Sequence, residues 1–152
     1  MKKLIDLLSE DVKKAFVFKG YDEKYGIVTL SNRPDLCQYQ CNGALAAAKE
    51  YRKAPIIIAQ EIAEVLRGSG KIKDVAAFNP GFININISDK FLAEYINDMR
   101  KAEDFGCEKE PAPKKIIIDY GGPNIAKPLH VGHMRSAIIG ESLKRIFKFM
   151  GN

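Results

Sequence analysis

Apolar residues recur with a spacing of about 3.6 positions along much of the chain, which is typical of helices with one buried face. Pro55 suits the first turn of a helix, because proline lacks only an N–H that has no partner there. Ser88 is a suitable N-cap for a further helix that begins at residue 89. The spacing and these signals predict four helices in the first hundred residues, over 3–18, 37–52, 55–67 and 89–102.

Two stretches show the pattern of β-strands. Residues 25–31 are short and rich in branched side chains, and residues 81–88, GFININIS, alternate isoleucine with asparagine. Because successive side chains of a strand point to opposite faces, this alternation predicts one buried face and one wet face. Together with the helices, it predicts an α+β domain in which helices pack on a small sheet.

Residues 103–115, EDFGCEKEPAPKK, have the composition of a linker, so we expect a domain boundary near residue 110. The expected domains are 1–110 and 111–152. After the boundary, IIIDY at 116–120 has the continuous apolar character of a strand buried in a parallel sheet. A Gly-Gly-Pro loop and a helix from about 131 to 150 follow. This pattern predicts the first β-loop-α unit of a Rossmann-like domain.

One such unit cannot bury both faces of a sheet, and exposing several large apolar side chains costs several kcal/mol, at roughly 1.5–3 kcal/mol each. The chain is therefore expected to be an N-terminal fragment that stops inside a truncated nucleotide-binding domain. We expect the longer protein to be a monomer. The apolar side of its last helix gives this piece a means of self-association.

Composition narrows the class of protein. No run of about 18 apolar residues is present, and the charged, amphipathic N-terminus differs from a signal peptide, so a cytoplasmic protein without membrane association is expected. The three cysteines are expected to be free thiols. Residues 1–110 carry 17 basic and 17 acidic side chains, whereas residues 111–152 carry seven and two. A basic segment suits a nucleotide or nucleic acid, although a solvated helix face has the same composition.

Both histidines of the chain, His130 and His133, lie where the last helix is expected to begin. Free backbone N–H groups and the helix dipole favour an anion there. Lys127 adds a positive charge, and Gly132 leaves room for a flat base. A structural zinc site is disfavoured because it needs four ligands, so no metal site is expected. Cys37 and Cys41, at a spacing of four, are expected on a helix face rather than on a metal.

The string IDYGGPNIAKPLHVGHMRSAIIGESLKRIFKFMGN, with its His-Val-Gly-His, resembles class I aminoacyl-tRNA synthetases, and arginyl-tRNA synthetases in particular. The stretches QYQCNGALAAAK (38–49) and NPGFININIS (79–88) resemble the additional N-terminal domain of the same family. The resemblance thus covers nearly the whole chain. It implies a ligase that activates arginine with ATP, accompanied by Mg²⁺, and transfers it to its tRNA.

The resemblance also implies roles for individual residues. His130, His133 and Lys127 would be catalytic and, with Gly132, would contact ATP, while Asn124 and Asp119 would contact arginine. Catalysis of in-line attack on the α-phosphate needs positioning and charge stabilisation more than proton transfer. Gly121 and Gly122 stand where many members have Ser-Ser, which weakens the inference for arginine. Asp119 is equally compatible with a structural role.

In that family the N-terminal domain binds the D-loop of tRNA, and the resemblance assigns this contact to Asn79, Phe82 and Asn84. Unpaired bases are read by stacking and side-chain hydrogen bonds, which an aromatic ring and two amides can supply. The alternative for Phe82 is core packing. Because residues 1–110 have no net charge, binding by this domain alone is expected to be weak.

Two other functions fit parts of the pattern. A nucleotidyltransferase has a similar His-x-Gly-His motif, but such proteins usually begin with it, without a preceding domain. A stand-alone RNA-binding module would use only the first domain. For the synthetase hypothesis, we expect the 152 residues alone to be inactive, since most of the pocket is missing. ATP–pyrophosphate exchange by the pure chain, with arginine and tRNA present, would contradict this.

Overall fold

A computed structural model describes residues 1–122 and 126–152 of the chain. Two compact units are distinguished. One comprises residues 2–101, and the other comprises residues 102–152 together with Met1. Within the described residues, no helix is long and apolar enough to cross a membrane.

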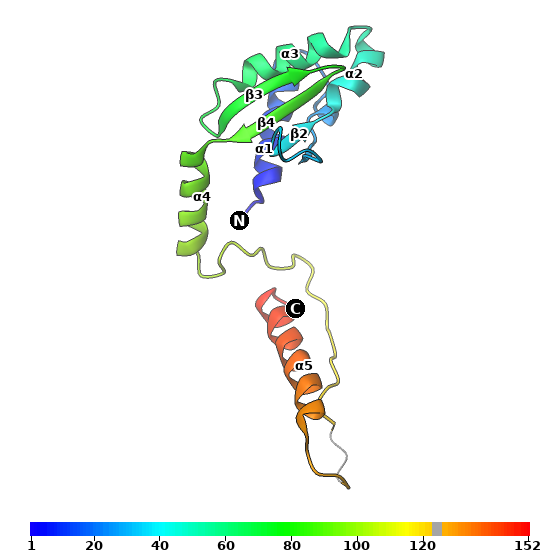
Figure 1. Ribbon diagram of the computed structural model, residues 1–152, viewed down its shortest axis with the longest axis vertical. Coiled ribbons are helices and arrows are strands. Elements are labelled where there is room, and N and C mark those ends of the chain that lie inside the picture. Colours follow the sequence, from blue (N-terminus) through cyan, green and yellow to red (C-terminus); the bar gives the residue numbers. More distant parts are fainter. Residues whose placement is uncertain (123–125) are drawn as a thin grey trace. The chain divides into compact units, whose positions relative to one another are not determined.

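The unit of residues 2–101 contains a four-stranded antiparallel sheet with the strand order β1-β2-β4-β3 (Figure 1). The two central strands, β2 and β4, are joined by the pairing of Gln40 with Asn84 and its neighbours. The strands are β1 (Val28–Leu30), β2 (Tyr39–Cys41), β3 (Ile72–Phe78) and β4 (Phe82–Ile87).

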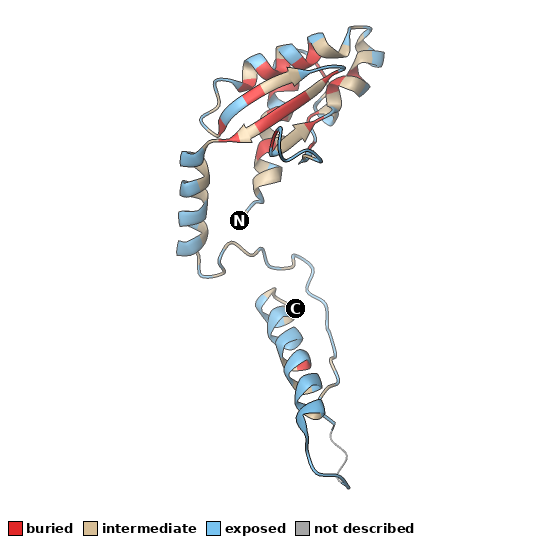
Figure 2. Ribbon diagram, viewed as in Figure 1, coloured by how far each residue is buried: buried red, intermediate tan, exposed pale blue. Residues whose placement is uncertain are grey.

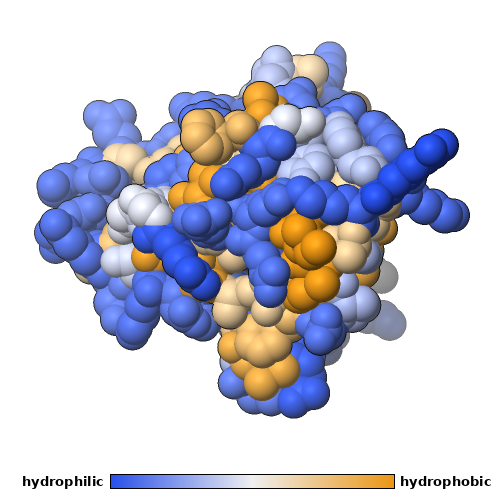
Figure 3. Space-filling view, turned by 90° about the horizontal axis from the view of Figure 1, so that it is seen from above, coloured by the Kyte–Doolittle hydropathy of each residue, from blue (hydrophilic) through white to orange (hydrophobic). Residues whose placement is uncertain are grey.

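Helices α1, α2 and α3 cover one face of this sheet and bury its apolar side chains (Figure 2). Phe16 is fully buried at the centre, edge-on to Tyr21 at a ring distance of 6.1 Å. On the face seen from above, hydrophobic residues form separate patches among hydrophilic ones (Figure 3). The helical elements are α1 (Leu4–Phe18), η1 (Glu23–Tyr25), α2 (Gly43–Tyr51), α3 (Pro55–Leu66) and α4 (Asp89–Lys101).

Most elements expected in this unit are present, which confirms the predicted α+β class. Pro55 is the first residue of α3, as predicted. The helix predicted over 37–52 is wrong in its first part, because residues 39–41 form β2 and the helix begins only at Gly43. Tyr39 and Cys41 turn toward the core while their neighbours turn away, and pairing with two strands outweighs the helical tendency. Strand β3 was not predicted.

The unit of residues 102–152 has one long helix, α5 (Val131–Phe149), within the predicted range. The predicted strand at 116–120 is not formed, and Ile117 is 86 % exposed. A parallel strand obtains its hydrogen bonds and burial from neighbouring strands, and no described residue offers one here. Apolar side chains of α5, including Ile138 and Ile146, are correspondingly more than half exposed.

Candidate functional site

The face of the sheet opposite the helices carries polar and aromatic side chains. Strand alternation puts Ile83, Ile85 and Ile87 in the core, so the intervening residues of β4 lie on this outer face. The same alternation on the neighbouring strands adds further residues. We define the outer face as Thr29, Gln38, Gln40, Asp74, Ala76, Phe78, Phe82, Asn84 and Asn86.

Amide side chains on the outer face are held by hydrogen bonds. Asn86 Oδ1 accepts from the backbone N–H of Gln38 at 3.0 Å, and Gln38 Oε1 accepts from the backbone N–H of Ile87 at 2.8 Å. Gln40 Nε2 donates to Asn84 Oδ1 at 2.8 Å. The prediction of a fully wet asparagine face is therefore wrong in part, since Asn84 is only 8 % exposed. Its cross-strand partners are Gln40 on β2 and Ala76 on β3.

Phe82 lies on the outer face beside this amide network and does not belong to the hydrophobic core. Its cross-strand partner is Phe78, which is 53 % exposed. Sequence reasoning missed Phe78, because β3 was not predicted. The alternative that Phe82 is a core residue is thereby disfavoured. Two aromatic side chains are instead presented at the same end of the β3–β4 hairpin.

The turn between β3 and β4 contains Asn79 and leads directly into Phe82, the first residue of β4. Asn79 is exposed and precedes Pro80 through a cis peptide bond. A Cβ atom on Gly81 would lie 2.6 Å from Pro55 Cβ, so glycine lets the turn approach the start of α3 closely. The three residues predicted to contact RNA therefore lie on one hairpin: Asn79 in the turn, and Phe82 and Asn84 on β4.

The two histidines cap the N-terminus of α5. His130 is the N-cap residue, and its Nδ1 accepts from the backbone N–H of Gly132 at 3.1 Å. His133 Nδ1 accepts from the backbone N–H of His130 at 3.2 Å. The ring centres are 4.1 Å apart. Because each Nδ1 is an acceptor, the proton of each neutral ring is on Nε2. Both rings thus offer an Nε2–H donor, and no described residue accepts from it.

Gly132 leaves room for the His130 ring in this cap. A Cβ at position 132 would lie 2.8 Å from Cε1 of His130, so a larger residue would displace the imidazole ring. His130 and His133 line an open hollow together with residues of α5 and with Gly121 and Gly122. Lys127 and Asp119 are exposed in the segments that precede the helix, and neither lines this hollow. The predicted arginine contact Asn124 lies outside the described residues.

Tyr120 packs directly on α5 at Gly140, further along the helix than the histidines. A Cβ on Gly140 would lie 2.1 Å from Tyr120 Cγ, so this glycine makes room for the ring. The Tyr120 hydroxyl donates to Glu141, which is also bonded by Arg145 at 2.9 Å and Lys144 at 3.1 Å. These hydrogen bonds, that of Tyr120 first, lower the pKa of Glu141 to about 2. The interaction links the segment before the loop to the helix that carries the histidines.

The cysteines are free thiols, as predicted. Cys37 and Cys41 do not share a helix face, however, because Cys41 is in β2 and Cys37 precedes it. Burial raises the pKa of the Cys41 thiol to about 11, which makes it unreactive. Among residues 1–122 and 126–152, no group of three histidine, cysteine or acidic side chains is arranged to hold a metal ion.

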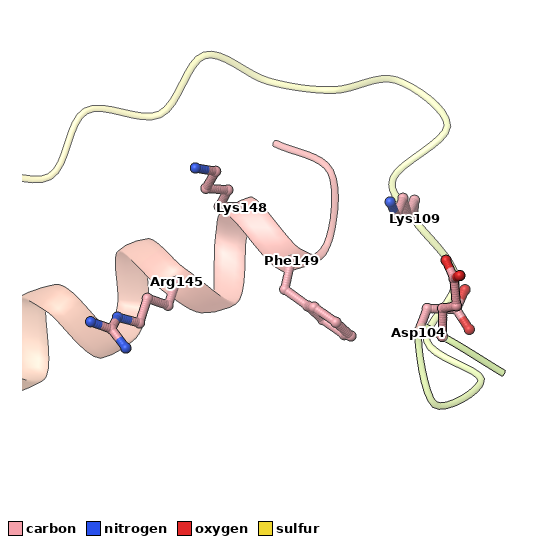
Figure 4. A pocket seen from close by; sticks show the side chains of 6 residues that line it. Asp104, Lys109, Arg145, Lys148 and Phe149 are labelled. Carbon is pink, nitrogen blue, oxygen red and sulfur yellow. The ribbon is translucent and has the colours of Figure 1, made fainter. Parts of the chain in front are cut away.

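A second hollow lies at the other end of α5, between its last turn and the segment that follows residue 102 (Figure 4). Phe149 extends toward the segment that carries Asp104 and Lys109, whereas Arg145 points away along the helix. Acidic and basic side chains are mixed around it, and none of the predicted site residues is present. This hollow is therefore not part of the candidate site.

Two protein families match the chain. The family described as Arginyl tRNA synthetase N terminal domain matches residues 2–87, and that described as tRNA synthetases class I (R), catalytic domain, matches residues 96–152. The first match covers more than half of the chain and contains the outer face. The second contains the two histidines and all of α5.

Curated relatives and solved structures agree with these families. The chain is 61 % identical to an arginine–tRNA ligase of Agathobacter rectalis and 57 % identical to one of Alkaliphilus oremlandii, over its whole length in both cases. It spans 26 % of each relative. The arginyl-tRNA synthetase of Plasmodium falciparum superposes with a TM-score of 0.59 at 25 % identity, covering 99 % of this chain and 29 % of that one. The Thermus thermophilus enzyme, at 23 % identity, has a TM-score of 0.53 and shares the fold over 98 % of this chain and 24 % of its own.

Proposed function

The chain belongs to the arginyl-tRNA synthetase family, and from this premise we propose that it supplies two sites to an arginine–tRNA ligase. Residues 1–110 form a domain that binds the D-loop of the arginine tRNA. Residues 111–152 begin the catalytic domain, in which arginine is activated with ATP and then transferred to the tRNA. The setting is protein synthesis in the cytoplasm.

The observation that carries the tRNA-binding role is the position of Phe82. Phe82 is a large, partly exposed aromatic side chain outside the core, on the face of the sheet opposite α1, α2 and α3, where it can stack on an unpaired base. Asn84 lies two residues further along the same face, within reach of the edge of such a base. Asn79, in the adjoining turn, adds a second amide. Stacking by Phe82 and hydrogen bonding by Asn79 and Asn84 are the proposed contacts.

The ATP-binding role is supported by the cap of α5. The Nε2–H groups of His130 and His133 are preorganised donors for phosphate oxygens, because both rings are fixed by their Nδ1 hydrogen bonds. The dipole of a 19-residue helix favours the same negative charge. Lys127 would approach the phosphates, and Gly132 would lie under the adenine. Mg²⁺ would arrive with ATP as part of the substrate rather than in a site built from these residues.

The proposed reaction needs no proton transfer by the histidines. As the arginine carboxylate attacks the α-phosphate, charge moves onto the leaving phosphates, and fixed N–H donors stabilise that charge. Asn124 and Asp119 are proposed to bind arginine near this position. Gly121 and Gly122 offer backbone groups but no hydroxyl. The proposed contact with arginine therefore relies on the side chains of Asn124 and Asp119.

Nuclear magnetic resonance of the isotope-labelled chain tests the tRNA-binding role. On addition of arginine tRNA, we expect the backbone signals of β2, β4 and the Asn79–Gly81 turn to shift, together with the side-chain amide signals of the outer face. The signals of α1, on the opposite side of the sheet, serve as the internal control. Shifts confined to the helical side, with an unchanged outer face, would contradict the proposal.

A further inference from the structure

A row of residues crosses all four strands on the outer face at the level of Asn84. Thr29 on β1 is opposite Gln40 on β2, Gln40 is opposite Asn84 on β4, and Asn84 is opposite Ala76 on β3. Ala76 has no side-chain hydrogen-bonding group, so Gln40 is the polar cross-strand neighbour of Asn84 in this row. The orientation of the Asn84 amide therefore depends on Gln40.

The hydrogen bond between these two side chains has a defined direction. Gln40 Nε2 donates and Asn84 Oδ1 accepts, over 2.8 Å. Every buried side-chain nitrogen or oxygen in the described residues has a hydrogen-bond partner. The Asn84 Nδ2 group has no partner in this part of the chain, so it reaches the surface even though the residue is only 8 % exposed. The Asn84 Nδ2 group thus keeps hydrogen-bonding capacity that an incoming ligand can use.

The neighbouring amide pair is arranged differently, which makes it a natural comparison. Gln38, which directly precedes β2 and lies on the same outer face, uses its Oε1 to accept from the backbone N–H of Ile87, and Asn86 Oδ1 accepts from the backbone N–H of Gln38. Neither side chain determines how Asn84 is turned. A charged substitution at Gln38 therefore alters the charge of the same face without altering the Asn84 amide.

We infer that Gln40 is a positioning residue for RNA recognition, which fixes the Asn84 amide so that it donates to an acceptor atom of the base stacked on Phe82. The acceptor is a ring nitrogen or carbonyl oxygen of the base edge. Gln40 itself does not contact the base in this arrangement. The inference rests on the proposed tRNA-binding function and assigns the chemistry by which one base is distinguished from another.

The substitution Gln40→Glu tests this inference, because a carboxylate accepts but does not donate. The Asn84 amide would then turn its N–H group toward the new carboxylate and present its oxygen to the base. Gln38→Glu is the matched control, since it adds the same charge on the same strand face and keeps an acceptor for Ile87. Gln40→Lys is a second variant, which can only donate and so preserves the original orientation.

The measurement is the affinity of the whole chain for arginine tRNA transcripts, with each of the four bases in turn at the D-loop position that wild type discriminates most. We expect Gln40→Glu to change the ranking of the four bases, with a loss of about fivefold for the preferred base relative to Gln38→Glu, as for one hydrogen bond. Gln38→Glu is expected to weaken all four equally, and Gln40→Lys is expected to keep the ranking. Melting curves establish that each variant is folded. If Gln40→Glu does not fold, the same ranking is measured with Gln40→Met, which lacks the donor. A changed ranking then supports the positioning role of Gln40, and an unchanged ranking overturns it.

The outcomes separate the two proposals. An unchanged ranking in Gln40→Glu, while wild type still binds and discriminates, would overturn the positioning role and leave the tRNA-binding function intact. No binding by wild type, or no loss on truncating Phe82, would overturn both.

Discussion

Replacing Gly43 with alanine is expected to lower the free energy of unfolding of the unit 2–101 by about 3 kcal/mol or more. An added Cβ would lie 1.8 Å from the carbonyl oxygen of Tyr25 and 2.7 Å from its carbonyl carbon. Both are backbone atoms, so no side chain can rotate to relieve the overlap. Overpacking at well-packed sites costs about 1–3 kcal/mol, and occasionally more, which puts a backbone clash at the upper end.

Chemical denaturation followed by circular dichroism measures this effect. Gly70→Ala is the matched control, because nothing lies within 4 Å of the Cβ that it would add. We expect the control to stay within about 0.5 kcal/mol of wild type, as surface substitutions usually do. A loss below about 1 kcal/mol for Gly43→Ala would show that the start of α2 and η1 are not packed as closely as described.

The sequence predicts helices well where one apolar face repeats over several turns. Helix α1 and helix α5 both fall within their predicted ranges. The short strand β2 escapes such reasoning, because three residues carry too little periodicity to compete with the alanine-rich segment that follows them. Its conformation is determined by pairing with β1 and β4, which are distant in sequence.

The candidate site divides in the same way. His130 and His133 can be recognised from sequence, because their cap depends on residues within three positions of each other. The Gln40–Asn84 hydrogen bond joins residues 44 positions apart, so it depends on strand register that sequence alone does not provide. The missing strand at 116–120 has a related cause. The apolar residues at 116–120 are typical of a buried strand. Such a strand forms only where neighbouring strands are present to pair with it.

Truncation of Phe82 to alanine is expected to weaken binding of arginine tRNA by about 1–3 kcal/mol, the usual contribution of one base stacked on an aromatic side chain. This corresponds to roughly five- to 150-fold in Kd. The fold should be retained, because Phe82, although partly buried, lies outside the hydrophobic core. Phe18→Ala is the matched control: it removes the same side chain from α1 in the same unit, where Phe18 is 77 % exposed.

The most direct test of the tRNA-binding role is a fluorescence anisotropy titration of wild type, Phe82→Ala and Phe18→Ala with arginine tRNA and with total tRNA, at low and moderate salt. We predict measurable binding by wild type and Phe18→Ala, a loss for Phe82→Ala at both salt concentrations, and weaker binding of all three as salt rises. Equal affinities for the three proteins, or no binding by wild type at low salt, would contradict the account.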